Sequence, residues 1–522
     1  MLNLAIFLEE TAWKFPHKTA IVFGDTRLTF AQLNSAANQI ANGLKAAGIG
    51  KGDKVALTCP NIPYFPMVYY GILKTGATVV PLNVLFKERE VAYHLTDSDA
   101  KAYFCFQGTA ELPMAQTGWA GFQTVDACEH FWVITPDPAA PSPIAGFPTL
   151  GMLMKDQSPE FDTVPTSPLG TAVILYTSGT TGKPKGAELS HSNMIMNALV
   201  VRDLFQLQHE DIQLITLPLF HSFGQTCQMN TSVLQGNTMV LIPRFDPDAV
   251  LGGMEKENVT IFCGVPTMYW ALLNHKDAEK YDLKKIARNL RVGVSGGASM
   301  PLEVMKGFEQ RFNVPILEGY GLSETSPVAT FNKLDMERKP GSIGTPIWGV
   351  QVKVVDAHDR ELPPGEPGEI VIRGHNIMKG YYRKPEETEA AIRNDWFHSG
   401  DVGKMDEDGY FYIVDRVKDM IIRGGFNVYP REVEEVLMTH PAISLAAVIG
   451  VPDEVKGEEV KAFVVLKEGA SAAPEEIVAW AKTQMADYKY PRLVEIVDSL
   501  PMTATGKILK KELRKQAGET GE

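Results

Sequence analysis

Short apolar runs that end at a glycine or a turn alternate, through most of this chain, with segments of helical spacing. Between the first two runs, an apolar residue recurs at each helical turn from Leu33 to Leu44. Because strand, helix and strand follow in this order, we expect parallel sheets covered by helices, with functional loops at the carboxyl ends of the strands. The runs that open the pattern are TAIVFG (19–24), DKVALTCP (53–60) and ATVVPLN (77–83).

The 522 residues are too many for one ordinary domain. Near residues 350–375 the pattern changes to short strands and turns, which predict β-hairpins in a small β-barrel-like part. After Arg416 the alternation of strands and helices returns and continues to a basic, helical end. We therefore predict an α/β fold with a large N-terminal domain (1–414) of parallel or mixed sheets covered by helices, a break at 415–418, and a smaller α+β domain (419–522).

Composition narrows the class of protein. Hydrophobic residues make up 44% of the chain and charged residues 22%, which is typical of a soluble globular protein, and no run approaches the roughly 20 apolar residues that span a membrane. The net charge of −13 disfavours unspecific binding of nucleic acid, and an anionic substrate would need local donors. Five scattered cysteines without metal-binding spacing indicate reduced thiols in a cytoplasmic protein, and Glu9 and Glu10 disfavour a signal peptide.

The segment with the most chemistry is YTSGTTGKPKG (176–186), which directly follows the strand AVILY (172–176). Its glycines let backbone N–H groups approach phosphate oxygens, and its hydroxyls and lysines supply more donors and charge. The bland alternative is a flexible linker, but this loop opens directly off a buried strand and carries two lysines. The GxxxxGK[ST] pattern of a P-loop NTPase is absent. The candidate phosphate-binding residues are Thr177, Ser178, Gly179, Thr180, Thr181, Gly182, Lys183 and Lys185.

Single polar residues in later segments suit the same chemistry. Glu324 is a hard carboxylate that suits Mg²⁺ beside a triphosphate, Tyr320 offers a flat face to adenine, and Asp401 can accept hydrogen bonds from two ribose hydroxyls. Outside such a context these types are more often a solvated glutamate, a packing tyrosine and a turn aspartate. Likewise, Lys507 in TATGK could simply open a basic helix, and His221 in PLFHSFG could be an ordinary core or surface histidine.

Taken together, these segments resemble the adenylate-forming superfamily, which holds acyl-CoA synthetases, luciferases and peptide-synthetase adenylation domains. They occur in the family's order and cover essentially the whole chain. The resemblance favours the acyl-CoA synthetase (fatty-acid–CoA ligase) branch, and it implies an ATP-dependent enzyme whose smaller C-terminal domain is mobile. The segments that carry it are YTSGTTGKPKG (176–186), PLFHSFG (218–224), VSGGA (294–298), EGYGLSETS (318–326), HSGDVGKMDEDGYFYIVDRVKDMIIRGGFNVYP (398–430) and PMTATGKILKKELR (501–514).

The resemblance also implies roles for individual residues. Lys507 would enter the active site from the C-terminal domain and bridge the acyl carboxylate and the phosphate, where a preorganised cation is worth several kcal/mol. His221 would border the carboxylate and the acyl pocket without acting as a base, since a carboxylate is already ionised at pH 7. Lys418 would be the hinge, and Glu324 and Thr177 would hold Mg²⁺. The other residues implied in binding nucleotide or coenzyme A are Gly297, Ala298, Glu318, Gly319, Tyr320, Gly321, Ser323, Asp401, Arg416, Gly424 and Gly425.

The substrate acid is constrained by the segment 217–234, which contains neither Asp nor Glu. An amino acid is therefore disfavoured, because its ammonium would be buried without a counter-ion. The apolar residues nearby could line a pocket or fill the core. A medium- to long-chain fatty acid is preferred over an aryl acid such as a cinnamate, mainly from frequencies within the family. No carrier module follows residue 514, so free coenzyme A is the expected acceptor. The apolar candidates are Phe220, Phe223, Cys227, Met229 and GVPTMYWALL (264–273).

Two other functions are compatible with the same fold. Adenylation could end in oxidation, as in luciferases, or the chain could be a non-catalytic ATP- and acyl-binding sensor. The presence of Lys507, Glu324 and Asp401 together with the intact loop argues against lost chemistry. A homodimer and peripheral contact with a membrane both stay open.

Overall fold

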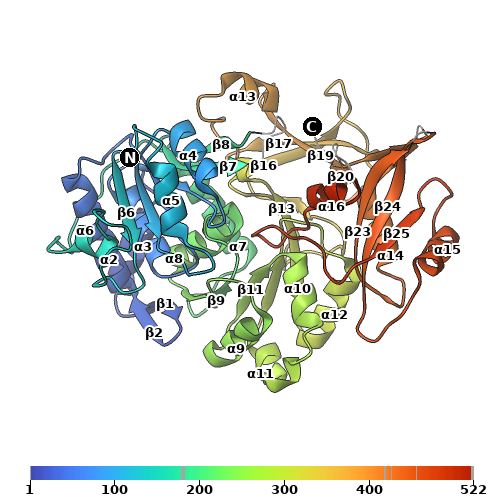
Figure 1. The fold of residues 1–522 in the computed structure, drawn as a ribbon, viewed down its shortest axis with the longest axis horizontal. Helices are drawn as coiled ribbons and strands as arrows, with labels where there is room; N and C mark the ends of the chain where they lie inside the picture. The colour runs from blue at the N-terminus through green and yellow to red at the C-terminus, as the bar shows by residue number, and fades with distance from the viewer. Residues whose placement is uncertain (1, 178–182, 417–418, 425, 454, 519–522) are drawn as a thin grey trace.

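The computed structural model describes residues 2–177, 183–416, 419–424, 426–453 and 455–518. In this part of the chain the predicted alternation of strands and helices is confirmed, and the strands form four sheets. Figure 1 shows the N-terminal residues at the left, the sheet of β16 to β20 at the top, and a lobe built from the last strands and helices at the right.

The strand AVILY belongs to a six-stranded sheet with the order β6-β5-β3-β4-β7-β8. Its strands are parallel except for β8, which turns back along β7, so that the predicted phosphate loop connects the two. The strands are β3 (Lys54–Thr58), β4 (Thr78–Pro81), β5 (Ala100–Phe106), β6 (His130–Ile134), β7 (Thr171–Thr177) and β8 (Lys185–Ser190). The helices that precede β7 are α1 (Ile6–Lys14), α2 (Phe30–Ala46), α3 (Tyr64–Lys74), α4 (Glu88–Asp97), α5 (Met114–Phe122) and α6 (Leu150–Met154).

The second large sheet has nine strands in the order β15-β14-β13-β12-β11-β9-β10-β1-β2, with antiparallel strands at its two edges and parallel strands between. Ser295 at the end of β12 pairs with Glu318, so VSGGA leaves the sheet beside the motif EGYG, which lies within β13. The strands are β1 (Thr19–Phe23), β2 (Thr26–Thr29), β9 (Ile212–Ile215), β10 (Thr238–Leu241), β11 (Ile261–Gly264), β12 (Val292–Ser295), β13 (Ile316–Gly321), β14 (Val328–Phe331) and β15 (Thr345–Pro346).

Helices connect these strands, and α7, α9 and α11 have side-chain caps at their first turns. Ser190 caps α7: its side chain accepts the N–H of Asn193 while the Asn193 side chain accepts the N–H of Ser190. The helical elements of this region are α7 (His191–Leu204), the π-helix η1 (Phe223–Asn230), α8 (Thr231–Gln235), α9 (Pro247–Glu257), α10 (Pro266–Leu273), the 3₁₀ turn η2 (Ala278–Lys280), α11 (Leu283–Asn289), α12 (Leu302–Phe312) and the 3₁₀ turn η3 (Ser323–Thr325).

The hairpins predicted near residues 350–375 form a five-stranded antiparallel sheet in which β19 pairs with β17, β18 and β20. Asp401 on β19 lies opposite Arg416 at the end of β20. The elements are β16 (Val350–Val355), β17 (Gly368–Gly374), α13 (Pro385–Ala391), β18 (Ile392–Arg393), β19 (Trp396–Met405) and β20 (Phe411–Arg416).

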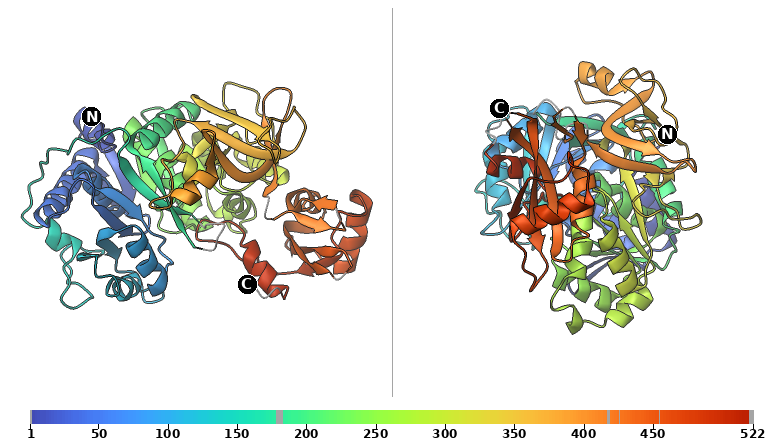
Figure 2. Two further views of the ribbon diagram at one scale, coloured as in Figure 1. Left: turned by 90° about the horizontal axis from the view of Figure 1, so that it is seen from above. Right: turned by 90° about the vertical axis from the view of Figure 1, so that its right-hand side faces the viewer.

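A fourth sheet of five strands begins at Ile421 and builds the C-terminal lobe. Figure 2 shows this lobe beside the N-terminal sheets, with the segment before α16 reaching back towards them. Its elements are β21 (Ile421–Arg423), β22 (Phe426–Val428), α14 (Pro430–Leu437), β23 (Ile443–Asp453), β24 (Gly457–Leu466), α15 (Pro474–Gln484), β25 (Leu493–Ile496) and α16 (Lys510–Gln516).

The buried apolar residues of the lobe form clusters separate from the cores of the N-terminal sheets. Trp270 on α10 is partly buried and packs against both the largest N-terminal cluster and one lobe cluster. The five cysteines are all buried and free, as their scattered spacing predicted. Among the described residues, no helix is both long enough and apolar enough to cross a membrane.

Candidate active site

The lysine of TATGK lies against the N-terminal domain. Thr267, in the first turn of α10, donates its hydroxyl hydrogen to the carbonyl of Gly506 at 2.6 Å. A methyl group built on Gly297 would lie 3.2 Å from Cε of Lys507 and 3.7 Å from its Nζ. Gly297 and Lys507, which the sequence predicted for one site, are therefore neighbours although they are 210 positions apart in the chain.

The sequence around this lysine forms a tight turn that aims it. The hydroxyl of Thr503 accepts the N–H of Lys507 at 3.0 Å, and the N–H of Thr503 donates to the Lys507 carbonyl at 2.7 Å. Gly506 has a φ of +79°, and a methyl group there would lie 2.8 Å from the Val265 side chain. A glycine is needed at this position, because any Cβ would be strained and would collide with β11–α10. Lys507 itself precedes α16 and is not part of the basic helix.

His221 lies close enough to Lys507 for the lysine charge to affect its protonation. Burial, followed by the charge of Lys507, lowers the pKa of His221 to about 3. Its Nδ1 accepts the N–H of Phe223 at 3.3 Å. The imidazole is therefore neutral at pH 7, and it borders the lysine without carrying a charge of its own.

Glu324 is buried at η3, in a group of contacts next to the phosphate loop. Tyr381 donates its hydroxyl hydrogen to Glu324 at 2.9 Å, and the Lys185 ammonium lies 4.3 Å from the centre of the Tyr381 ring. Lys185 pairs with Thr177 across β7 and β8. The carboxylate of Glu324 and the hydroxyl of Thr177 are hard oxygen donors that fit Mg²⁺, which keeps most of its ligands as water and substrate phosphate.

Both ends of the phosphate loop are held by α4, which the sequence did not indicate. Tyr176, at the end of β7, donates to Asp97 at 2.9 Å, and its ring packs edge-on against His94 with 4.4 Å between ring centres. On the other side of the loop, Tyr93 donates to the carbonyl of Pro184 at 2.7 Å. Residues 178–182 between these anchors lie outside the described residues, and Lys183 is exposed.

Tyr320 and Asp401, predicted for adenine and ribose, meet directly. The Tyr320 hydroxyl donates to the Asp401 carboxylate at 2.6 Å, and Asp401 is only 4% exposed. The neighbouring Gly319 and Gly321 are required by packing, because a Cβ on Gly319 would collide with Phe331 and a Cβ on Gly321 with the Pro327 backbone. Ser323 opens η3 next to Glu324.

Glu318 lies deeper than the other predicted nucleotide-binding residues. It is 1% exposed and accepts the N–H of Met300 at 3.0 Å. Burial raises its pKa to about 7, against the opposing effect of the Arg431 charge from the C-terminal lobe. The Glu318 carboxyl is therefore close enough to the C-terminal lobe to be affected by one of its charges.

The remaining predicted residues divide into three groups. Ala298 is exposed next to Gly297, beyond the end of β12. Gly424 lies at the β21–β22 turn with a φ of +58°, where its N–H donates to the Lys456 carbonyl at 2.7 Å. Lys418, Gly425 and the side chain of Arg416 lie outside the described residues.

The segment expected to line an acyl pocket forms the π-helix η1. Phe220 and Phe223 are partly exposed, and a Cβ on Gly296 would lie 3.2 Å from the Phe223 ring. Cys227 and Met229 are instead buried in the main core, which is the alternative that the sequence left open. The segment also buries a polar network that composition could not reveal, in which Asn230 bonds to Tyr69 and Tyr70, and Tyr69 to Gln225.

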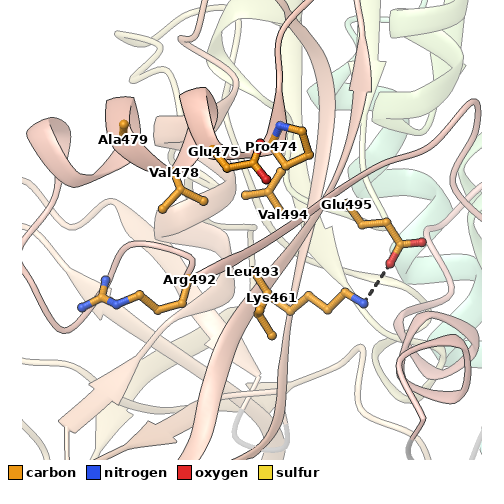
Figure 3. Close-up of a pocket in the computed structure, with 9 residues that line it drawn as sticks. All are labelled: Lys461, Pro474, Glu475, Val478, Ala479, Arg492, Leu493, Val494 and Glu495. Atoms are coloured by element: carbon orange, nitrogen blue, oxygen red, sulfur yellow. Dashed lines mark ion pairs between the residues drawn. The ribbon is translucent and has the colours of Figure 1, made fainter.

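Two grooves lie elsewhere on the described surface. One of about 500 Å³ lies between α15 and β25 of the C-terminal lobe, where Lys461 and Glu495 form an ion pair at 2.8 Å (Figure 3). The other, of about 260 Å³, opens at the amino-terminal end of β7, the end opposite to the phosphate loop. None of the residues that line either groove is a predicted site residue.

Comparison with protein families agrees with this arrangement. The family model "AMP-binding enzyme" matches residues 8–382, and the model "AMP-binding enzyme C-terminal domain" matches residues 432–507. The second match ends at Lys507.

Individual relatives extend over nearly the whole chain. A long-chain-fatty-acid–CoA ligase of Bacillus subtilis (strain 168) is 39% identical over 99% of this chain and 95% of its own length. A feruloyl-CoA synthase of an Amycolatopsis species is 38% identical over 96% of both chains. The crystal structure of ATP-bound MatB from Rhodopseudomonas palustris superimposes with a TM-score of 0.90 at 33% identity and covers 99% of both chains.

Fold, site and relatives define one class of protein, an adenylate-forming enzyme. The chain belongs to the AMP-binding enzyme family and, within it, to the acyl-CoA synthetase branch of AMP-forming acid–thiol ligases. The fold class and the family expected from the motifs are thereby confirmed.

Proposed function

We propose that this protein is an ATP-dependent acyl-CoA synthetase that activates a medium- to long-chain fatty acid in two steps, with ATP, Mg²⁺ and coenzyme A. The observation that carries the proposal is the approach of Lys507 to Gly297, which brings an ammonium from the C-terminal lobe to the end of β12, where VSGGA leaves the large sheet beside EGYG of β13.

In the first step, a carboxylate oxygen of the acid attacks the α-phosphorus of ATP. The bond from the α-phosphorus to the bridging oxygen breaks, and pyrophosphate leaves with the bonding electrons. Negative charge gathers on the α-phosphate in the transition state, and the ammonium of Lys507 is placed to stabilise it. Because His221 is neutral beside it, that ammonium is not repelled by a second positive charge on the histidine.

The nucleotide would be held by the groups around this lysine. Tyr320 and Asp401 form the adenine and ribose side, and the loop anchored by α4 forms the phosphate side. Glu324 and Thr177 would hold Mg²⁺, which supplies neutralising charge to the leaving pyrophosphate. Tyr381 donates a hydrogen bond to one oxygen of the Glu324 carboxylate, which holds that carboxylate in place.

In the second step, the sulfur of coenzyme A attacks the acyl carbonyl, the thiol proton is released, and the bond to the phosphate oxygen breaks to free AMP. With the C-terminal lobe in its present position, Lys507 occupies the space in front of Gly297. The thiol of coenzyme A therefore needs a different position of the lobe. We propose residues 415–418 as the hinge for this rotation, because one sheet ends at Arg416 and the next begins at Ile421. Rotation would bring the turn that contains Gly424 towards the space that Lys507 occupies.

The absence of Asp and Glu from residues 217–234 supports a neutral acyl group, and the fatty-acid ligase of Bacillus subtilis supports a fatty acid. A second candidate is an aryl acid of the cinnamate type. It is favoured by the feruloyl-CoA synthase, which is as similar to this chain as the fatty-acid ligase is.

A panel of acids tests the two candidates. Saturated fatty acids from short to long chain and a series of cinnamates and benzoates are each incubated with ATP, Mg²⁺ and coenzyme A, and AMP release is measured. We expect medium- to long-chain fatty acids to give the highest kcat/KM. A higher value for cinnamates would replace the first candidate by the second, and no AMP with any acid would indicate a non-catalytic sensor.

A further inference from the structure

A carboxylate on the strand next to Asp401 bonds to two residues of the segment that carries it. Glu369 lies on β17, and its Oε1 accepts the backbone N–H of Gly400 at 2.9 Å. Its Oε2 lies 2.8 Å from Nδ1 of His398, whose side chain is 6% exposed. A single side chain thus holds the residues on both sides of Ser399, immediately before Asp401.

Ser399 also links β19 to β17. Its hydroxyl donates to the carbonyl of Ile370, the residue after Glu369, at 2.6 Å, and accepts the N–H of Asp401 at 3.1 Å. Two consecutive residues of β17 therefore fix three consecutive residues of β19 through side chains.

Side chains are needed here because the backbone pairing is interrupted. The register between β17 and β19 shifts between Glu369 and Val371, and Gly400 has a φ of +72°. An irregularity of this kind changes the face of the sheet to which the following side chain points. Asp401 directly follows this irregularity, and its buried carboxylate accepts a hydrogen bond from Tyr320.

Other charged side chains lie next to Glu369 and His398. Arg393 lies 2.8 Å from Nδ1 of His398 and donates to Asp359 at 2.9 Å. Two acidic and two basic or titratable side chains thus alternate here, and Glu369 is partly buried among them. The hydrogen bond that it accepts from Gly400 is charge-assisted, which is among the stronger kinds.

We propose that Glu369 is a positioning residue for nucleotide binding: it holds the irregular segment 398–400 and so aims the Asp401 carboxylate at the ribose hydroxyls. This rests on the ribose role in the proposed function. Glu369 does not itself touch the nucleotide. It acts through Asp401, and its removal should therefore weaken only the part of the affinity that depends on the ribose hydroxyls.

Affinity for two nucleotides tests this. The dissociation constants of ATP and of 2′,3′-dideoxy-ATP, which lacks both ribose hydroxyls, are measured by calorimetry with Mg²⁺ for the full chain. For Glu369→Ala we expect the affinity for ATP to fall about tenfold, the scale of one charge-assisted hydrogen bond, and the affinity for dideoxy-ATP to change less than about twofold. Glu369→Gln, which keeps an acceptor for Gly400, should lose less than Glu369→Ala.

Two further variants make each outcome decisive. Glu366→Ala removes an exposed acid just before the same strand and should leave both affinities unchanged. Asp401→Ala should abolish the preference for ATP over dideoxy-ATP. If Asp401→Ala loses the preference for ATP but the Glu369 variants keep it in full, the inference is wrong while the proposed function stands. If Asp401→Ala also keeps the preference for ATP, the ribose role of Asp401 itself is wrong. Should Glu369→Ala not fold, the same comparison is decided by Glu369→Gln, and equal losses for both nucleotides would overturn the inference.

Discussion

Among single residues, Lys507 is the one on which the proposed first step depends most. Lys507→Ala should abolish acid-dependent pyrophosphate release, by a factor of about 10² or more, because it removes the ammonium that lies beside Gly297 and is placed to stabilise the charge on the α-phosphate. The second step does not use this ammonium, so thioester formation from supplied acyl-AMP should be largely unchanged. The two half-reactions are measured separately, as pyrophosphate release and as thioester formed.

Lys511→Ala is the matched control, since Lys511 is an exposed lysine four positions further on. It should leave both half-reactions as they are. Equal loss of both in Lys507→Ala would contradict a role confined to adenylation.

Functional residues that lie within a sequence motif were predictable, whereas residues that act through a partner distant in the chain were not. Lys507, Glu324 and Asp401 were predicted from their motifs. Tyr381 and Glu369 were not, because their hydrogen bonds join positions 57 and 31 residues apart, and no local pattern marks them. Nor could the sequence show that Glu318 is buried at the lobe junction, since that depends on Arg431 and Met300.

At the scale of elements, α4 should determine how well the phosphate loop binds ATP. Tyr93→Phe removes the hydroxyl that holds the Pro184 carbonyl and keeps the ring. We expect the KM for ATP to rise about three- to tenfold with little change in kcat, because a lost neutral hydrogen bond costs about 1 kcal/mol and loosens the loop before and after reaction alike. Steady-state kinetics at saturating acid measure both constants.

Tyr281→Phe is the matched control. Its hydroxyl donates to Asp248 on the exposed surface, away from the phosphate loop, so the KM for ATP should not change. A fall in kcat with an unchanged KM in Tyr93→Phe would mean that α4 does not act through ATP binding.

Elements with one clear period were predictable and the others were not. The strands β1, β3 and β4 lie within the expected apolar runs, and α2 includes the stretch from Leu33 to Leu44 that has helical spacing. The helix α4 was missed because the face that it buries is short and consists of Val91, His94 and Leu95, one of which is polar. The π-helix η1 was missed because a shift from four- to five-residue hydrogen bonding leaves no mark in composition.

For the whole molecule, sequence could suggest the break at 415–418 but not how the two parts lie against each other. The break coincides with a change in pattern along the chain, whereas the arrangement depends on contacts such as that of Trp270 with Ser444, between residues 174 positions apart. The position of the hinge and the rotation about it remain predictions.

The contact of Trp270 gives a way to test whether the two parts separate during the reaction. Trp270 donates its indole N–H to the hydroxyl of Ser444 on β23 at 2.8 Å, while its ring packs against cores on both sides. Trp270→Phe keeps an aromatic ring and removes the hydrogen bond, which should weaken the arrangement that presents Lys507 by about 1 kcal/mol and slow pyrophosphate release about fivefold. Thioester formation from supplied acyl-AMP should be unchanged or faster, because the lobe then leaves this arrangement more easily. Trp480→Phe, within the lobe on α15, should alter neither half-reaction. Equal slowing of both half-reactions in Trp270→Phe would mean that the contact persists through the whole reaction and that the lobe does not rotate away from α10.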